Sequence, residues 1–138
     1  KRSARIIIYP EKGFMKEKLH YDIFLRLYSS LLAKNLEVVA LESLGLTIEA
    51  DHKVSLEDLT EIKKFFSEGG IFVSNDSGMA HLAGASGLFT ITVFAGFDPA
   101  VWRPRGRNIS LILGQDILNL SDLERIILKA VNNQNCPL

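Results

Sequence analysis

Five short apolar runs, each rich in Ile, Val, Leu or Phe, constrain the fold of this chain more than any other feature. They cover residues 6–9, 38–41, 71–74, 89–95 and 109–113. The runs are mostly apolar and continuous, with only Ser and Thr as polar residues, which is typical of strands that are covered on both faces of a sheet. The chain is therefore expected to build a sheet that is buried between two layers.

Stretches with apolar residues at helical spacing separate these runs, and two of them open with capping-box-like pairs. One pair is Ser55 and Asp58, in a helix that halts near Gly69, and the other is Ser121 and Glu124. Two further helices are expected over residues 22–34 and 80–86. Because strand and helix alternate, we predict the α/β class: a Rossmann-like parallel sheet with helices on both faces, joined by right-handed crossovers.

Length and composition limit the number of domains, the kinds of partner, and the presence of membrane spans or disulfides. Its 138 residues are 47% hydrophobic, with 16 basic side chains against 16 acidic ones, so we expect one domain over residues 1–138 and no nucleic-acid partner. No apolar run is long enough to span a bilayer, and a single cysteine, Cys136, allows no internal disulfide. Because Lys1 is not a methionine and a strand-like run follows almost at once, the domain is expected to be a piece of a longer polypeptide.

A polar turn follows the third apolar run and is the first candidate for a functional site. In open α/β sheets, ligands bind beyond the carboxyl ends of the strands. Here the strand leads into Asn-Asp-Ser-Gly-Met at 75–79 and then into a helical stretch of mostly small residues. Gly78 permits close approach to the backbone, and Ser77 adds a hydroxyl donor. The free N–H groups and the helix dipole make this turn a candidate seat for a phosphate or a pyrophosphate.

The same residues also have a purely structural interpretation. Asp76 or Ser77 either caps the helix or contributes to anion binding. His81 lies four residues after Ser77, so the two side chains share one helix face. The imidazole either donates to a phosphate oxygen or is hydrogen-bonded within the protein. Both alternatives stay open at this point.

Two other segments are expected at the same edge of the sheet. The loop after the first apolar run carries Lys12, Lys16 and Lys18, which either reach a diphosphate or belong to a solvated loop of mixed charge. Glu42 follows the second run. It either accepts from ribose hydroxyls, as acidic residues at strand ends do in nucleotide sites, or is an ordinary surface glutamate.

Other catalytic patterns are absent from the sequence. It contains no G-x-x-x-x-G-K-[ST], no G-x-G-x-x-G and no G-x-S-x-G. Its three histidines have no metal-ligand spacing with the cysteine or with one another. We therefore expect neither a cofactor nor a metal.

Three segments in order, residues 75–87, 93–99 and 102–106, resemble the C-terminal half of the heptosyltransferases, glycosyltransferase family nine. The pattern of that family is D-[ST]-G-x-x-H-L-A-x-A, a short strand, F-G-x-T-x-P and then P-x-G. In the first block the aspartate, hydroxyl, glycine, histidine, leucine and alanine all fall at their expected offsets. The resemblance implies the C-terminal half of a GT-B glycosyltransferase, the half that binds a nucleotide-sugar donor, typically ADP-heptose.

The resemblance also implies roles for individual residues. Donor contacts are expected from Asp76, Ser77, Gly78, Met79, His81, Lys16, Lys18 and Glu42. Residues 76–79 would surround the donor phosphates, and His81 would support them from the first helical turn. One of the two lysines would contact a phosphate, and the glutamate would serve the nucleoside end.

The remaining partners that the resemblance implies lie outside this chain. The sugar would pass to the core of lipopolysaccharide, in the cytoplasm or at the inner face of the inner membrane, without a metal. The catalytic base belongs to the N-terminal acceptor domain, so the isolated chain is expected to bind nucleotide and turn over little. Two alternatives stay open: a degenerate, non-catalytic nucleotide-binding module, and a GT-B domain like that of a nucleotide-sugar epimerase.

Overall fold

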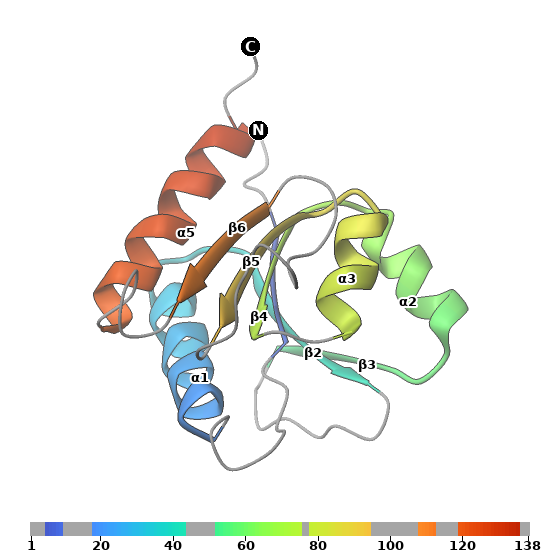
Figure 1. Ribbon diagram of the computed structural model, residues 1–138, viewed down its shortest axis with the longest axis horizontal. Helices are drawn as coiled ribbons and strands as arrows, with labels where there is room; N and C mark the ends of the chain where they lie inside the picture. Colours follow the sequence, from blue (N-terminus) through green and yellow to red (C-terminus); the bar gives the residue numbers. More distant parts are fainter. Residues whose placement is uncertain are drawn as a thin grey trace.

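A computed structural model of the chain describes residues 5–9, 18–43, 52–75, 78–94, 108–112 and 119–135. Strands and helices alternate along these residues (Figure 1). Their order is β1 (Ile6–Tyr9), α1 (Lys18–Ala33), β2 (Val38–Ser43), β3 (Lys53–Leu56), α2 (Leu59–Phe66), β4 (Ile71–Asn75), α3 (Gly78–Ala85), β5 (Phe89–Phe94), β6 (Asn108–Ile112) and α5 (Leu120–Asn135). None of the helices in this described part has the length and apolarity that crossing a bilayer requires.

The strands form one six-stranded sheet in the order β3-β2-β1-β4-β5-β6, and every pairing in it is parallel. From β1 the chain moves outward to β2 and β3, and from β4 it moves outward in the opposite direction. The direction therefore reverses between β1 and β4, where Tyr9 pairs with Ser74. This is the topological switch point of a Rossmann-like sheet, and ligands bind beyond the carboxyl ends of the strands there. The predicted fold class is confirmed.

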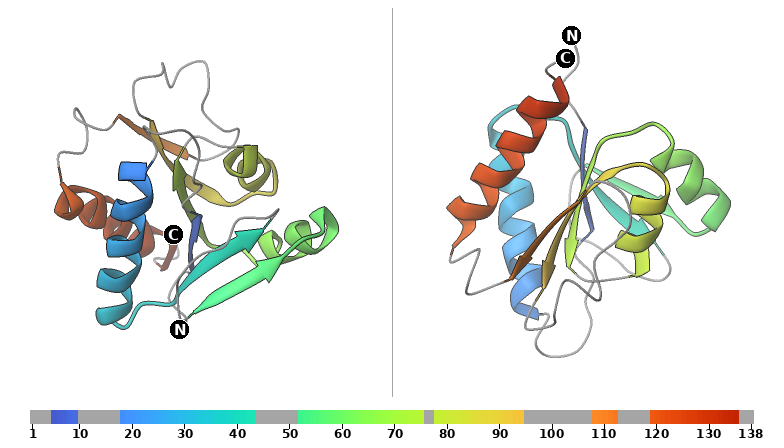
Figure 2. Two further views of the ribbon diagram at one scale, coloured as in Figure 1. Left: turned by 90° about the horizontal axis from the view of Figure 1, so that it is seen from below. Right: turned by 45° about the horizontal axis from the view of Figure 1, so that its top comes forward.

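Helices cover both faces of the sheet (Figure 2). The helices α1 and α5 pack on one face, against Ile6 and Ile8 of β1. The helices α2 and α3 pack on the other face, against Ile7 and Tyr9 of the same strand. Crossovers of one hand that run in opposite directions along a sheet must lie on opposite faces, which explains why α1 and α3 lie apart.

The two buried layers differ in chemistry. The α1 and α5 layer is filled by large apolar side chains such as Leu27 and Ile127, both fully buried. On the α3 side, Ala80 and Ala83 bring the helix close to β4 and β5. The buried hydroxyl groups of the sheet lie on this side, at Ser74, Thr90 and Thr92. Within the described residues, the two threonine hydroxyls have no hydrogen-bond partner.

One predicted helix start was wrong, because an edge strand precedes α2. Ser55 lies in β3, where it pairs with Glu42, and does not cap the helix. Asp58 is the N-cap, and its side chain accepts from the backbone N–H of Thr60 at 2.6 Å. As an edge strand, β3 alternates between exposed and half-buried residues, so it has no continuous apolar run to reveal it.

The last helix also begins before its predicted pair. The side chain of Asn119 accepts from the backbone N–H of Asp122 at 3.1 Å, so the cap lies two residues before Ser121. Glu124 is not part of a capping box. Its carboxylate instead accepts from the hydroxyl of Ser30 at 2.7 Å and pairs with Lys34 at 3.0 Å, which links α5 to α1.

The amino ends of β1 and β4 are joined through Arg5. Its backbone carbonyl accepts from Ile71 at 2.8 Å. Its guanidinium donates to the carbonyls of Gly69 and Phe65 at 2.7 and 2.9 Å, and lies 4.2 Å from the centroid of the Phe65 ring. Gly70 has φ +129°, and a Cβ at that position would lie 2.6 Å from the Arg5 carbonyl oxygen. This amino edge is thus held by backbone and side chain together.

Candidate functional site

The turn that the sequence singled out lies at the switch point of the sheet. β4 ends at Asn75 beside β1, and α3 begins at Gly78. Asp76 and Ser77, which join the two, lie outside the described residues. The first backbone N–H groups of a helix have no partner within the helix, and they carry the positive end of its dipole. The end of β4 and the start of α3 therefore lie at the switch point, where a helix start is suited to bind a phosphate.

The side chain of Met79 is packed in the core and is not exposed to a ligand. Its side chain is 6% exposed and belongs to the core between α3 and the sheet, with Phe66 and Phe72. That packing fixes the first turn of α3 against β4. The backbone N–H of Met79, rather than its thioether, is then the group that is available to an anion.

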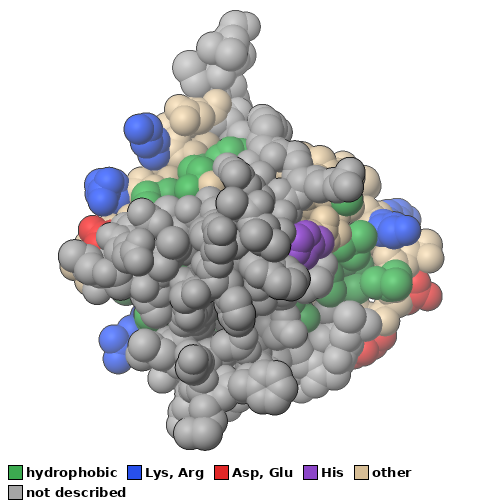
Figure 3. Space-filling view, viewed as in Figure 1, with side chains coloured by type: hydrophobic (Ala, Val, Ile, Leu, Met, Phe, Trp, Pro, Cys, Tyr) green, Lys and Arg blue, Asp and Glu red, His purple; other side chains and the backbone are tan. Residues whose placement is uncertain are grey.

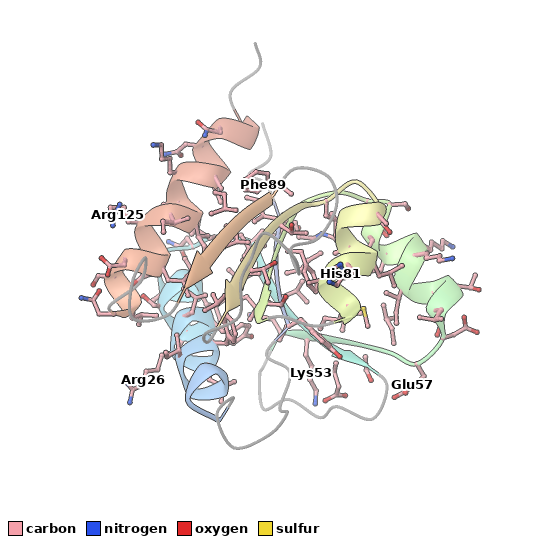
Figure 4. The ribbon with its side chains drawn as sticks, in the orientation of Figure 1. Arg26, Lys53, Glu57, His81, Phe89 and Arg125 are labelled. Carbon is pink, nitrogen blue, oxygen red and sulfur yellow. The ribbon has the colours of Figure 1, made fainter. Side chains whose placement is uncertain are left out.

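His81 has the opposite environment. It is exposed on α3, one turn after Gly78, and its ring makes no hydrogen bond with any other described residue (Figure 4). The ring of His81 is therefore not part of the buried core. An exposed imidazole near a helix start is placed to donate to a bound anion.

Glu42 lies near the carboxyl end of β2 and is mostly buried. Its side chain is 14% exposed, and its Oε2 lies 3.1 Å from the Nζ of Lys53 on β3. Lys53 was not among the predicted site residues, because β3 itself was not predicted. The relevant signal is the strand register, which pairs Ala40 with Lys53 and so places the lysine two pairs away from Glu42, on the same face of the sheet.

The lysines of the first loop are not described to the same extent. Lys12 and Lys16 lie outside the described residues, and Lys18 is the first residue of α1, with no description of its side chain. The topology nevertheless brings the end of β1, the start of α3 and Glu42 to one edge of the sheet. Neighbouring strands are about 4.8 Å apart, so the ends of β2 and β4 are separated by roughly 10 Å.

On the face that Figure 3 shows, charged side chains of the described residues lie at the left and right margins, and apolar side chains lie at the right, over α2 and α3. Among the described residues, no group of three or more His, Cys, Asp or Glu side chains is placed to hold a metal ion. An open groove of about 420 Å³ runs along α5 from Lys34 to Asn132, but it lies on the α1 side, away from α3.

Comparisons with known proteins agree with this architecture. E. coli heptosyltransferase WaaC with ADP matches 97% of this chain, with a TM-score of 0.69 and 16% sequence identity. This chain spans 45% of the length of that protein. At this level of identity the match shows the fold, which is that of a GT-B heptosyltransferase half. No curated protein matches the chain.

The family assignment rests on the sequence itself. Residues 54–126 match the glycosyltransferase family 9 (heptosyltransferase) profile, which is more than half of the chain. The matched segment runs from β3 to the start of α5 and contains the whole β4–α3 connection. The resemblance noted from the motifs is thereby confirmed. The chain belongs to glycosyltransferase family 9, the family of the heptosyltransferases.

Proposed function

We propose that this chain is the donor-binding domain of a glycosyltransferase and holds a nucleotide-diphosphate sugar. One observation carries the proposal: the N-terminus of α3 lies directly beyond the carboxyl end of β4, at the switch point of the sheet. A helix start at such a position is suited to bind a diphosphate. Family membership supplies the class of reaction.

Individual residues have distinct roles in this proposal. The backbone N–H groups of Gly78 and Met79 and the hydroxyl of Ser77 bind the diphosphate, and Asp76 lies beside it as part of the same turn. His81 donates from the exposed side of α3. Lys16 or Lys18 approaches the diphosphate from the connection between β1 and α1, and β1 is the strand next to β4. Glu42 accepts from the ribose, about two strand spacings from the phosphates.

These groups favour departure of the diphosphate. In an inverting displacement, an acceptor hydroxyl attacks the anomeric carbon while the bond to the nucleoside diphosphate breaks. Oriented N–H donors and a positive helix end stabilise the negative charge that develops on the leaving oxygen. The base that removes the proton of the acceptor hydroxyl belongs to another part of the protein. The chain by itself then binds nucleotide without turnover.

The proposal also names a specific sugar donor and a specific acceptor. We take ADP-heptose as the donor, since the solved heptosyltransferase with the same fold was determined with ADP. The acceptor is the core of lipopolysaccharide, and it is held by an N-terminal domain, with residues 1–138 forming the donor-binding domain. Such a protein works in the cytoplasm or at the inner face of the inner membrane.

An amide NMR titration of the chain with ADP, UDP and GDP tests this proposal. We expect selective shifts at Gly78 to His81 with ADP, since the phosphates and the base both contribute to binding. No shift with any of the three at millimolar concentration would contradict donor binding by this domain. A product assay on the full-length protein then separates sugar transfer from epimerisation and from binding without catalysis.

A further inference from the structure

We propose that Lys53 is a positioning residue, which holds the carboxylate of Glu42 in the orientation that accepts from the ribose of the bound nucleotide. The inference rests on the proposed function and deepens it, because it assigns a role to a residue outside the phosphate seat. The observation behind it is the 3.1 Å pair between the Nζ of Lys53 and the Oε2 of Glu42.

The backbone of Lys53 is anchored beside Glu42 from two sides. The preceding residue, His52, donates its backbone N–H to the hydroxyl of Tyr28 on α1 at 2.6 Å. The carbonyl of His52 accepts from the backbone N–H of Ala40 on β2 at 3.0 Å. Tyr28 is itself buried in the core. The start of β3 is therefore fixed to both β2 and α1, and the lysine extends from a fixed point along the edge of the sheet (Figure 4).

The burial of the two partners indicates which one is being held. The side chain of Glu42 is 14% exposed and that of Lys53 is 38% exposed. A mostly buried carboxylate loses solvation, and an opposite charge must compensate for that loss. An ordinary surface ion pair has two exposed partners and contributes little to stability. Here the lysine reaches from the more exposed edge strand to a carboxylate that lies deeper in the sheet.

Two consequences for nucleotide binding follow from this pairing. A glutamate side chain has several rotamers, and fixing one of its oxygens restricts the carboxylate to one orientation before the ligand arrives. The ammonium also neutralises the carboxylate charge. The phosphates are expected roughly 10 Å away at the end of β4, where an uncompensated carboxylate would repel them. Loss of Lys53 should therefore weaken recognition of the ribose in particular.

The test is to measure the affinity of the chain for ADP, 2′-deoxy-ADP and 3′-deoxy-ADP. We expect the wild type to prefer ADP over at least one deoxy analogue by about tenfold, a normal value for a hydrogen bond to a charged acceptor. The K53M variant should lose that preference, to within about twofold. The K53R variant should keep most of it, because the cation is preserved. The exposed Lys63 of α2 gives a charge-matched control, K63M, which should retain the wild-type preference.

A second pair of variants distinguishes positioning from folding. In the E42Q background the ribose preference is already reduced, so adding K53M should reduce it little further. Thermal unfolding checks that each variant is folded, and K53Q replaces K53M in the comparison if the methionine variant unfolds. Rescue by arginine is a result that a merely structural loss of packing would not give.

The possible outcomes separate this inference from the function on which it rests. If the wild type binds ADP with a ribose preference and K53M keeps that preference, the role of Lys53 is overturned and the proposed function stands. If the wild type binds ADP equally well with and without the ribose hydroxyls, Glu42 does not contact the ribose and the inference is overturned. If the wild type binds no ADP, the proposed function fails, and the inference fails with it.

Discussion

The two ends of β1 and β4 show how one pair of strands is used for stability at one edge of the sheet and for a site at the other. At the amino edge, Arg5 binds two carbonyls, covers the Phe65 ring and leaves no room for a side chain at Gly70. Burial lowers the pKa of its guanidinium, against the opposing effect of Glu68 and Glu37. At the carboxyl edge, α3 begins at Gly78 beyond the end of β4 and carries the exposed His81.

The comparison teaches that the two edges of the sheet are expected to serve different purposes. Polar groups at the amino edge have partners within the protein, so changes there should alter the free energy of unfolding. Polar groups at the carboxyl edge are proposed to contact the donor, so changes there should alter affinity. Each of the following substitutions tests whether this separation holds.

The largest effect is expected at Gly70, on the amino edge. The G70A variant places a Cβ 2.6 Å from a backbone oxygen of Arg5, at φ +129°, so both strain and a clash oppose it. We expect a loss of about 3 kcal/mol in the free energy of unfolding, measured with urea. Gly69 is the matched control, because it has φ +85° but open space around it. The G69A variant should lose about 1 kcal/mol, and equal losses in both variants would contradict the clash.

At the carboxyl edge, G78V should affect binding instead. The added side chain blocks close approach of a phosphate to the start of α3. We expect ADP affinity to fall by about a hundredfold or more, which corresponds to roughly 2.7 kcal/mol. The midpoint of urea unfolding should change little, since Gly78 is the first residue of the helix. Isothermal titration calorimetry measures the affinity, with G69A as a control that should bind normally. Unchanged affinity in G78V would refute the phosphate seat.

A smaller effect on the same edge is expected for His81. If the imidazole donates to a phosphate, H81A should weaken ADP binding by about 1 to 2 kcal/mol. Its exposure means that little stability should be lost. The H81Q variant keeps a donor and should recover part of the affinity. A variant that unfolds more easily but binds ADP as the wild type does would instead make His81 structural.

The smallest effect is expected for Glu124 on α5, which lies at neither the amino edge nor the carboxyl edge of the sheet. It serves as a third case beside the two edges. Hydrogen bonds from Ser30 and Lys34 lower the pKa of Glu124 below its ordinary value of 4.5, although partial burial opposes the shift. The pKa of Glu124 is lower in the folded state than in the unfolded state. Ionised Glu124 therefore stabilises the fold at pH values above its unfolded-state pKa. The contribution is lost as the pH falls through the folded pKa.

We therefore expect E124Q to flatten the acid branch of the stability profile by less than about 1 kcal/mol. Urea unfolding at a series of pH values from neutral to acidic measures this branch. The exposed Glu61 of α2 is a matched control, and E61Q should retain the wild-type slope. ADP affinity should be the same in both variants, because α5 packs on the face of the sheet opposite α3. An E124Q profile identical to that of the wild type would show that the link between α1 and α5 is energetically neutral.

Most of the fold followed from local patterns. The five apolar runs correspond to β1, β2, β4, β5 and β6, with ends displaced by two residues at most. Four of them, β1, β2, β4 and β5, lie inside the sheet, and the apolar sequences of strands covered on both faces carry a strong local signal. The sixth strand, β3, was missed because it lies at the sheet edge with alternating exposure. Ser55 was consequently misread as a helix cap.

The candidate site was predicted only in part. The turn after β4 was predicted from its composition, and the structure places the end of β4 and the start of α3, which flank it, at the switch point. Asp76, Ser77 and Lys16 lie outside the described residues, so their roles stay predictions. The partner of Glu42 could not be found from the sequence, since it depends on the register of a strand that was itself missed.

The sequence by itself determined that this chain builds a buried parallel sheet with a polar, glycine-containing turn before a helix of small residues, and it determined the family. These properties depend on residues that are close in sequence, because periodicity, capping and turn chemistry act over a few positions. Only the tertiary structure decided which distant residues meet. Arg5 reaches Gly69 across 64 positions, and Lys53 reaches Glu42 across a strand pairing. Such contacts depend on strand order and register, which are fixed by the packing of the whole sheet rather than by any local pattern.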